Sequence, residues 1–124
     1  MNYYRSTIEK LIHNFYKERT LSHLNEYFFL SSHLHFALTL EIVRANYINK
    51  EISVEDLYAK IPKIFGSRST IKTILRQGVN SNFFSKNTSL KDKRIKIYNL
   101  NKKSKIALEL WIENRKNLYD NKFY

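Results

Sequence analysis

Residues 53–101 decide the fold, and they read SVEDLYAKIPKIFGSRSTIKTILRQGVNSNFFSKNTSLKDKRIKIYNLN. Ser53 and Asp56 have the spacing of a capping box, which predicts the start of a short helix. Pro62 ends that helix because proline cannot continue the hydrogen-bond ladder. Ser67 is the expected N-cap of a second helix that runs to about residue 81. The stretch therefore begins as helix, turn, helix.

The second of these helices is amphipathic. Ile71, Ile74, Leu75 and Gly78 recur at helical spacing, so they share a buried face. The residues of the basic and hydroxylic face are Ser69, Lys72, Thr73 and Arg76. Because a glycine in mid-helix costs about 1 kcal/mol in propensity, we expect the helix to fray or bend near Gly78. Asn82 can take the left-handed conformation that ends a helix.

A hairpin and a long helix follow. Short strands are expected at residues 83–86 and 95–98, where side chains alternate with a period of two. The polar loop between them is basic. Asn101 is the expected cap of a last helix, whose apolar face is too wide for one packing partner. Helix, turn, helix, hairpin and helix are the elements of a winged helix-turn-helix.

The segment before this stretch, residues 1–50, is predicted to be helical. Ser6 and Glu9 have the spacing of a capping box for a first helix. A second helical region spans about residues 22–47 and is apolar around most of its girth, with Ser32 as a cap that divides it. We therefore expect one domain over residues 1–124, mainly α with a small β-hairpin, in which the N- and C-terminal helices (1–50 and 101–121) flank residues 53–100.

Positive charge is concentrated in one part of the chain. Thirteen of the 22 Lys and Arg residues lie between Lys60 and Lys105, and Asp92 is the only acid in that stretch. The net charge of the whole chain is +11, so this one stretch accounts for all of the excess positive charge. A surface that binds a polyanion at one end of a fold produces this distribution.

Residues from about 32 to 118 resemble the MarR family of bacterial transcription regulators, and the motifs that carry the resemblance lie in residues 67–101. Residues 67–71, SRSTI, are similar to the S-R-S-T-V that begins the family's recognition helix, and residues 92–94, DKR, to the D-x-R of its wing. Residues 100–101, LN, stand where the family has Leu-Thr before its last helix. The resemblance implies a transcription regulator that binds DNA as a homodimer formed by the N- and C-terminal helices.

Nine residues are predicted to contact double-stranded DNA. Arginine can bind guanine through two hydrogen bonds, and Ser and Thr can contact bases or phosphates. Free amides at a helix start add a phosphate site, and a basic hairpin suits the minor groove. The nine are Arg68, Ser69, Thr70, Lys72, Thr73 and Arg76 in the helix and Lys91, Lys93 and Arg94 in the hairpin. We expect Asp92 to orient a neighbouring cation by ion pairing. The alternative is an ordinary solvated face.

Other sites receive less support from the sequence. The aromatic residues Tyr27, Phe28, Phe29 and Phe36 are interpreted as core. A pocket for a small-molecule effector, as in MarR-like proteins, is the alternative for them. The four histidines lack the spacing of metal ligands, and no catalytic constellation is recognisable, so we expect no enzyme activity, metal or cofactor.

The sequence also disfavours proteins that span a membrane, bind structured RNA or bind lipid. The chain has no cysteine, no run of about 18 apolar residues and no signal-peptide core at its start, so we expect a cytoplasmic protein without a membrane span. A binder of structured RNA would use an exposed aromatic platform, and none can be assigned in this chain. A lipid-binding protein would need one basic amphipathic helix, whereas the basic segment here is divided among turns and strands.

The sequence thus predicts a sequence-specific, dimeric DNA-binding transcription regulator. The alternative is a replication initiator or a nucleoid-type DNA-binding protein built on the same winged domain. Mapping the bound sites across the source genome separates the two, since clustering at one origin favours the alternative.

Overall fold

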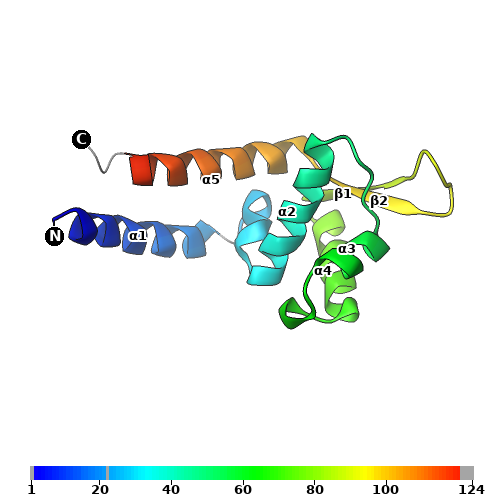
Figure 1. Cartoon of the computed structure of the whole chain (residues 1–124), viewed down its shortest axis with the longest axis horizontal. Coiled ribbons are helices and arrows are strands. Elements are labelled where there is room, and N and C mark those ends of the chain that lie inside the picture. The colour runs from blue at the N-terminus through cyan, green and yellow to red at the C-terminus, as the bar shows by residue number, and fades with distance from the viewer. Residues whose placement is uncertain (1, 22, 121–124) are drawn as a thin grey trace.

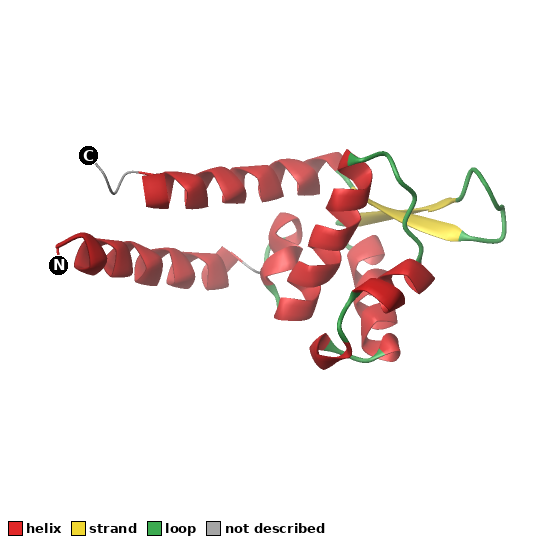
Figure 2. Cartoon of the chain, in the orientation of Figure 1, coloured by secondary structure: helices red, strands yellow, loops and turns green. Residues whose placement is uncertain are grey.

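The computed structural model describes residues 2–21 and 23–120, and the chain is mainly helical with one small antiparallel sheet (Figures 1 and 2). This is the expected class of mainly α with a β-hairpin. In chain order the elements are α1 (Asn2–Leu21), η1 (Asn25–Leu30), α2 (His33–Tyr47), α3 (Val54–Lys60), η2 (Lys63–Phe65), α4 (Arg68–Asn80), β1 (Phe84–Thr88), β2 (Lys96–Leu100) and α5 (Lys102–Asp120).

The start of the first helix differs from the prediction. α1 begins at Asn2, so Ser6 lies within the helix and the capping box proposed for Ser6 and Glu9 is wrong. The reason is that residues 3–5 contain no glycine or proline that would interrupt a helix before Ser6. Residues 1, 22 and 121, which the predicted helices included, lie outside the described residues.

The predicted division at Ser32 is confirmed. The Ser32 hydroxyl accepts a hydrogen bond from the backbone N–H of His35 at 3.1 Å and caps α2. The segment before it, η1, is a 3₁₀ helix with a non-helical kink at Tyr27. The kink and the cap thus divide the apolar region into η1 and α2, which pack against each other.

Capping residues also fix both helices of residues 53–80. Ser53 and Asp56 form the predicted capping box, because each side chain accepts from the other residue's backbone N–H. α3 then ends at Lys60, two residues before Pro62. Ser67 caps α4 by accepting from Thr70 N–H at 3.2 Å. These boundaries are set by local hydrogen bonds, which is why the sequence predicts them.

α4 does not fray at Gly78. The helix continues to Asn80, and Asn82, at a φ of 62°, takes the left-handed conformation predicted for it. Phe83 N–H donates to Gly78 O at 2.8 Å and Asn82 N–H to Val79 O at 3.1 Å. These two bonds form a Schellman motif, which satisfies the last carbonyl groups of the helix.

The two strands pair with a register that runs from Phe84 opposite Leu100 to Thr88 opposite Lys96. Both strands start one residue later than predicted. Phe83 N–H is used to end α4, and Ile95 N–H donates to Asp92 O within the turn, so neither N–H group is available to the opposite strand. On its other edge, β2 bonds to the segment before α3 through Tyr98 N–H and Ile52 O at 2.9 Å.

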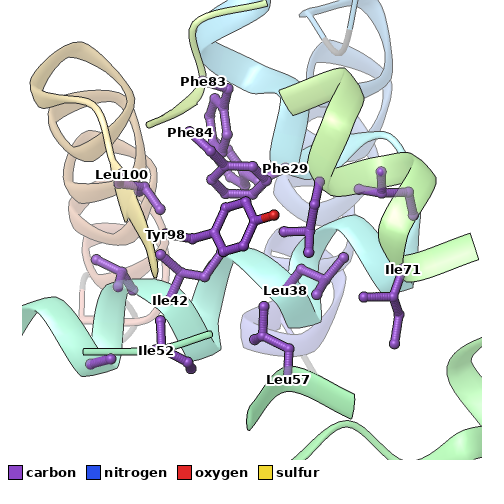
Figure 3. Close-up of a cluster of buried hydrophobic side chains, with 14 of the residues drawn as sticks. Phe29, Leu38, Ile42, Ile52, Leu57, Ile71, Phe83, Phe84, Tyr98 and Leu100 are labelled. Atoms are coloured by element: carbon purple, nitrogen blue, oxygen red, sulfur yellow. The ribbon is translucent and has the colours of Figure 1, made fainter. Parts of the chain in front are cut away.

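One hydrophobic core joins these elements (Figure 3). Phe29, Phe83 and Phe84 are fully buried, with Phe83 and Phe84 at the start of the hairpin. The residues that surround them are Leu38 and Ile42 of α2, Leu57 of α3, Ile71 of α4 and Tyr98 and Leu100 of β2. Tyr27, Phe28 and Phe36 pack against this core partly buried, which agrees with their interpretation as core residues.

The first and last helices project from one end of the molecule (Figure 1). α1 and α5 run antiparallel, so the start of α1 and the end of α5 lie at the same end of this pair (Figure 1). We call this pair the helical arm. Arg115 of α5 binds both carboxylate oxygens of Glu18 across it, at 3.0 and 3.1 Å. α3, α4 and the hairpin lie at the opposite end. Among the described helices, none has the length and apolarity to cross a membrane.

Candidate nucleic-acid interface

α4 presents a polar face that no other element covers. Arg68, Ser69, Thr70, Lys72 and Arg76 are exposed and Thr73 is half-buried. The opposite side of the helix is buried in the core through Ile71, Ile74, Leu75 and Gly78. All six helical residues predicted to contact DNA therefore lie on or beside a solvent-facing surface.

Three hydroxyl groups gather at the start of α4. Ser67 Oγ lies 3.1 Å from Ser69 Oγ and 3.0 Å from Thr70 Oγ1. The first backbone N–H groups of a helix carry partial positive charge and attract anions. Hydroxyl donors beside such amides suit the oxygen atoms of a phosphate group.

Arg68 does not extend freely into solvent. Its guanidinium carbon lies 5.0 Å from the ring centre of Tyr58, a half-buried residue of α3. A cation over an aromatic face at an exposed site is stabilised by about 0.5–1 kcal/mol. Tyr58 thus restricts the directions that Arg68 can take. No pattern in the sequence points to Tyr58, because the packing of α3 on α4 is what brings it to Arg68.

The hairpin loop, residues 89–95, carries the second group of cations. Lys91, Lys93 and Arg94 are all exposed. Asp92 accepts hydrogen bonds from the backbone N–H, Nε and Nη2 of Arg94, at 3.0 to 3.1 Å. The Arg94 guanidinium holds the pKa of Asp92 below its usual value, and Asp92 raises the pKa of Arg94. Asp92 therefore orients Arg94, as its predicted role requires.

The cations of α4 have no acidic partners. Within residues 2–21 and 23–120, the ion pairs join Arg44 to Glu41, Arg94 to Asp92 and Arg115 to Glu18. Lys72 and Arg76 are thus available to an external anion, and so are Lys91 and Lys93 in the hairpin loop. Arg94 offers less net charge, because Asp92 compensates it.

The two cationic groups belong to neighbouring elements. α4 packs against β1, and Figure 1 shows α4 and the hairpin at the end of the molecule away from the helical arm. Further along the basic stretch, Lys102 and Lys103 are exposed at the start of α5, whereas the Lys105 ammonium lies 4.4 Å from the ring centre of Tyr47. Glu109 accepts a hydrogen bond from the Tyr47 hydroxyl and raises its pKa.

A second feature of the surface follows the helical arm. A groove of about 570 Å³ lies between α1, η1 and α5 and is lined by Tyr27, Trp111 and Arg115 among others. Trp111 packs edge-on against Phe29 and Phe36, at 5.9 and 5.4 Å between ring centres. Of the four aromatic residues for which an effector pocket was the alternative, Tyr27 lines this groove, whereas Phe29 is fully buried in the core.

Comparison with known proteins does not place this chain in a family: no family model, no curated protein and no solved structure matches it. The resemblance of residues 67–101 to MarR proteins therefore depends on the quoted motifs alone.

Proposed function

We propose that this protein is a sequence-specific, double-stranded DNA-binding transcription regulator with a winged helix-turn-helix fold of MarR type. In this proposal α3 and α4 are the helix-turn-helix, α4 enters the major groove, and the hairpin is the wing. The protein acts without catalysis, in the cytoplasm.

One observation carries the proposal. The uncovered face of α4 combines arginine, lysine and hydroxyl side chains that no acid of the described residues neutralises, and α4 packs against β1 of the hairpin whose loop carries three further cations. A helix has the diameter that the major groove admits, and arginine is the commonest side chain that reads guanine there. A merely soluble surface would mix both signs of charge.

The proposal includes a homodimer. On α1, the apolar residues Tyr4, Ile8, Ile12 and Phe15 recur at helical spacing and are 43 to 64% exposed. Ile106 and Leu110 of α5 are also about half exposed. A continuous apolar surface of this kind is typical of a protein interface. A two-fold dimer through the helical arm would present two α4 helices to successive major grooves, about 34 Å apart.

The test is selection of bound sites from random duplex DNA, followed by binding measurements on the selected site. We expect a palindrome. Arg68→Ala and Arg76→Ala should each weaken binding by about 1–3 kcal/mol and relax the preference for a base. Lys93→Ala should weaken all sequences alike, because a phosphate contact carries no sequence information.

The matched control is Lys17→Ala, which removes an exposed cation of α1 that lies outside the basic stretch. It should bind as the wild type does. If each protomer neutralises about five phosphates, the logarithm of the binding constant should fall with the logarithm of salt concentration at a slope of roughly −9 for the dimer. Wild-type binding by all three interface variants would contradict the proposal.

A further inference from the structure

An acidic residue lies against the base of the cationic hairpin loop. Glu51 stands between α2 and α3, after Asn49 ends α2 in the left-handed conformation. Its Oε1 accepts a hydrogen bond from Ser89 Oγ at 2.6 Å, and its Oε2 accepts one from Leu90 N–H at 2.8 Å. Both carboxylate oxygens therefore hold the hairpin loop to a segment 38 residues away in the chain.

Ser89 continues the connection into the loop. Ser89 is 5% exposed, and its hydroxyl accepts hydrogen bonds from Lys91 N–H at 3.1 Å and Asp92 N–H at 3.2 Å. A serine hydroxyl has one proton and two lone pairs. Because the proton is donated to Glu51, every hydrogen-bonding position of this hydroxyl is in use.

The chain of contacts ends at the cations. Asp92, whose N–H is held by Ser89, accepts the three hydrogen bonds from Arg94 described above. The loop is closed by Ser89 N–H to Ile95 O at 2.9 Å and Ile95 N–H to Asp92 O at 3.0 Å. Glu51 is thus linked by consecutive hydrogen bonds to Arg94, through two intermediate side chains.

The location of this carboxylate is electrostatically unfavourable for binding a polyanion. The hydrogen bond from Ser89, then that from Leu90 and the charge of Lys91, lower the pKa of Glu51, so it is ionised at neutral pH. A negative charge beside a DNA-binding loop repels phosphate. Its position is understandable if holding the loop contributes more to binding than this repulsion costs.

We propose that Glu51 is a positioning residue of the nucleic-acid interface, which acts through Ser89 to fix the direction of Lys91, Lys93 and Arg94. This inference depends on the proposed function for its binding partner. It differs from that proposal in assigning a gain in DNA affinity to an acidic residue that cannot contact phosphate favourably. A preorganised loop binds more tightly because less conformational entropy is lost on binding.

The experiment compares three variants on the selected duplex at fixed salt. We expect Glu51→Ala to bind about tenfold more weakly, which corresponds to about 1.4 kcal/mol. Glu55→Ala, which removes the same charge from an exposed position of α3, is the matched control and should bind as tightly as the wild type or slightly more tightly. Glu51→Gln keeps one acceptor oxygen and should recover part of the loss.

A second measurement separates positioning from general stability. In the free protein, hydrogen exchange at the Leu90, Lys91 and Asp92 amides should accelerate in Glu51→Ala, with the amides of α2 and α4 unchanged. In a protein that already carries Lys91→Ala and Lys93→Ala, adding Glu51→Ala should cost far less affinity than in the wild type. If Glu51→Ala does not fold, Ser89→Ala serves in its place, because it removes the Ser89 hydroxyl that joins Glu51 to the Lys91 and Asp92 N–H groups.

The outcomes distinguish the two proposals. Wild-type protein that fails to bind any duplex would overturn the proposed function, and the exchange measurement would still test whether Glu51 orders the loop. Wild-type protein that binds, together with Glu51→Ala that binds equally well or more tightly, would overturn the positioning role alone.

Discussion

At Gly78, helix propensity favours a residue other than glycine, whereas core packing leaves no room for a side chain. A Cβ atom added there would lie 2.2 Å from Cδ2 and 2.7 Å from Cε2 of Phe84, whose ring is fully buried. Glycine therefore occupies a mid-helix position because α4 and β1 approach each other too closely for any side chain. The sequence indicates that this glycine lowers the helix propensity of α4. The contact with Phe84 that requires a glycine is visible only in the structure.

We accordingly expect Gly78→Ala to destabilise the protein. Overpacking a core costs about 1–3 kcal/mol, which exceeds the gain of about 1 kcal/mol in helix propensity. Chemical denaturation measures the free energy of unfolding. Gln77→Ala, on the exposed side of the same turn, is the control and should lie within about 0.5 kcal/mol of the wild type. A Gly78→Ala protein as stable as that control would contradict the packing argument.

His35 leads to a prediction about pH. Burial lowers its pKa below the ordinary value of 6.5, and its ring packs edge-on against Phe28 with Nδ1 2.6 Å from Ser32 Oγ. The unfolded chain therefore takes up the proton first as the pH falls. The stability contributed by neutral His35 is fully present above pH 6.5 and is lost as the pH falls through the folded-state pKa.

Thermal unfolding at several pH values checks this. Between pH 7.5 and 5, the melting temperature of the wild type should fall by more than that of a His35→Gln protein, since glutamine does not titrate. The other three histidines are common to both proteins and act as an internal control. Parallel curves for the two proteins would show that His35 contributes nothing to the pH dependence.

Among the elements, the helix ends are the features that follow most directly from local sequence. Ser32, Ser53 and Ser67 all cap the helices that were predicted to begin after them. α2 ends with the same pair of bonds as α4, since Asn49 has a φ of 55° and Lys50 N–H donates to Ala45 O at 2.9 Å. An asparagine in the left-handed conformation therefore terminates both helices.

Substitution of Asn82 tests this arrangement. The left-handed conformation costs most residues about 1–2 kcal/mol, so Asn82→Ala should lower the free energy of unfolding by about 1 kcal/mol. Asn82→Gly should leave stability unchanged or raise it. Asn80→Ala, at the last residue of α4, is the control because helical geometry is favourable for alanine. Equal stability of the Ala and Gly proteins at position 82 would contradict the assignment of the cap.

At the scale of the whole molecule, the helical arm leaves apolar surface uncovered. On α1 the exposed apolar residues include Ile8, Ile12 and Phe15, and Phe15 lines a groove together with Glu18 and Arg115, the ion pair that joins the two helices of the arm. Among the described side chains of the helical arm, the hydrophobic ones in or against the buried core are Ala107, Leu108 and the partly buried Trp111. A second copy of the chain would cover this surface, as the proposed homodimer requires.

We expect Ile8→Glu to convert a dimer into a monomer, because a charge would be buried in the interface without a partner. Sedimentation equilibrium at micromolar concentration measures the change. His13→Glu, exposed five residues further along and on another side of α1, should stay dimeric. A wild-type protein that sediments as a monomer at these concentrations would contradict the dimer.

The amino-acid sequence by itself determined the helix caps, the order of the elements, the amphipathic face of α4 and the concentration of positive charge, because each depends on residues a few positions apart. Ser6 was misassigned for the same reason, since a local cap motif does not exclude a helix that begins earlier.

Only the tertiary structure decided why Gly78 is a glycine, that Tyr58 lies under Arg68, and that Glu51 holds the hairpin loop. These contacts join residues far apart in the chain, and their partners are brought together by the packing of whole elements around one core. No spacing in the sequence encodes such a contact, because the distance between its two residues along the chain has no fixed relation to their distance in space.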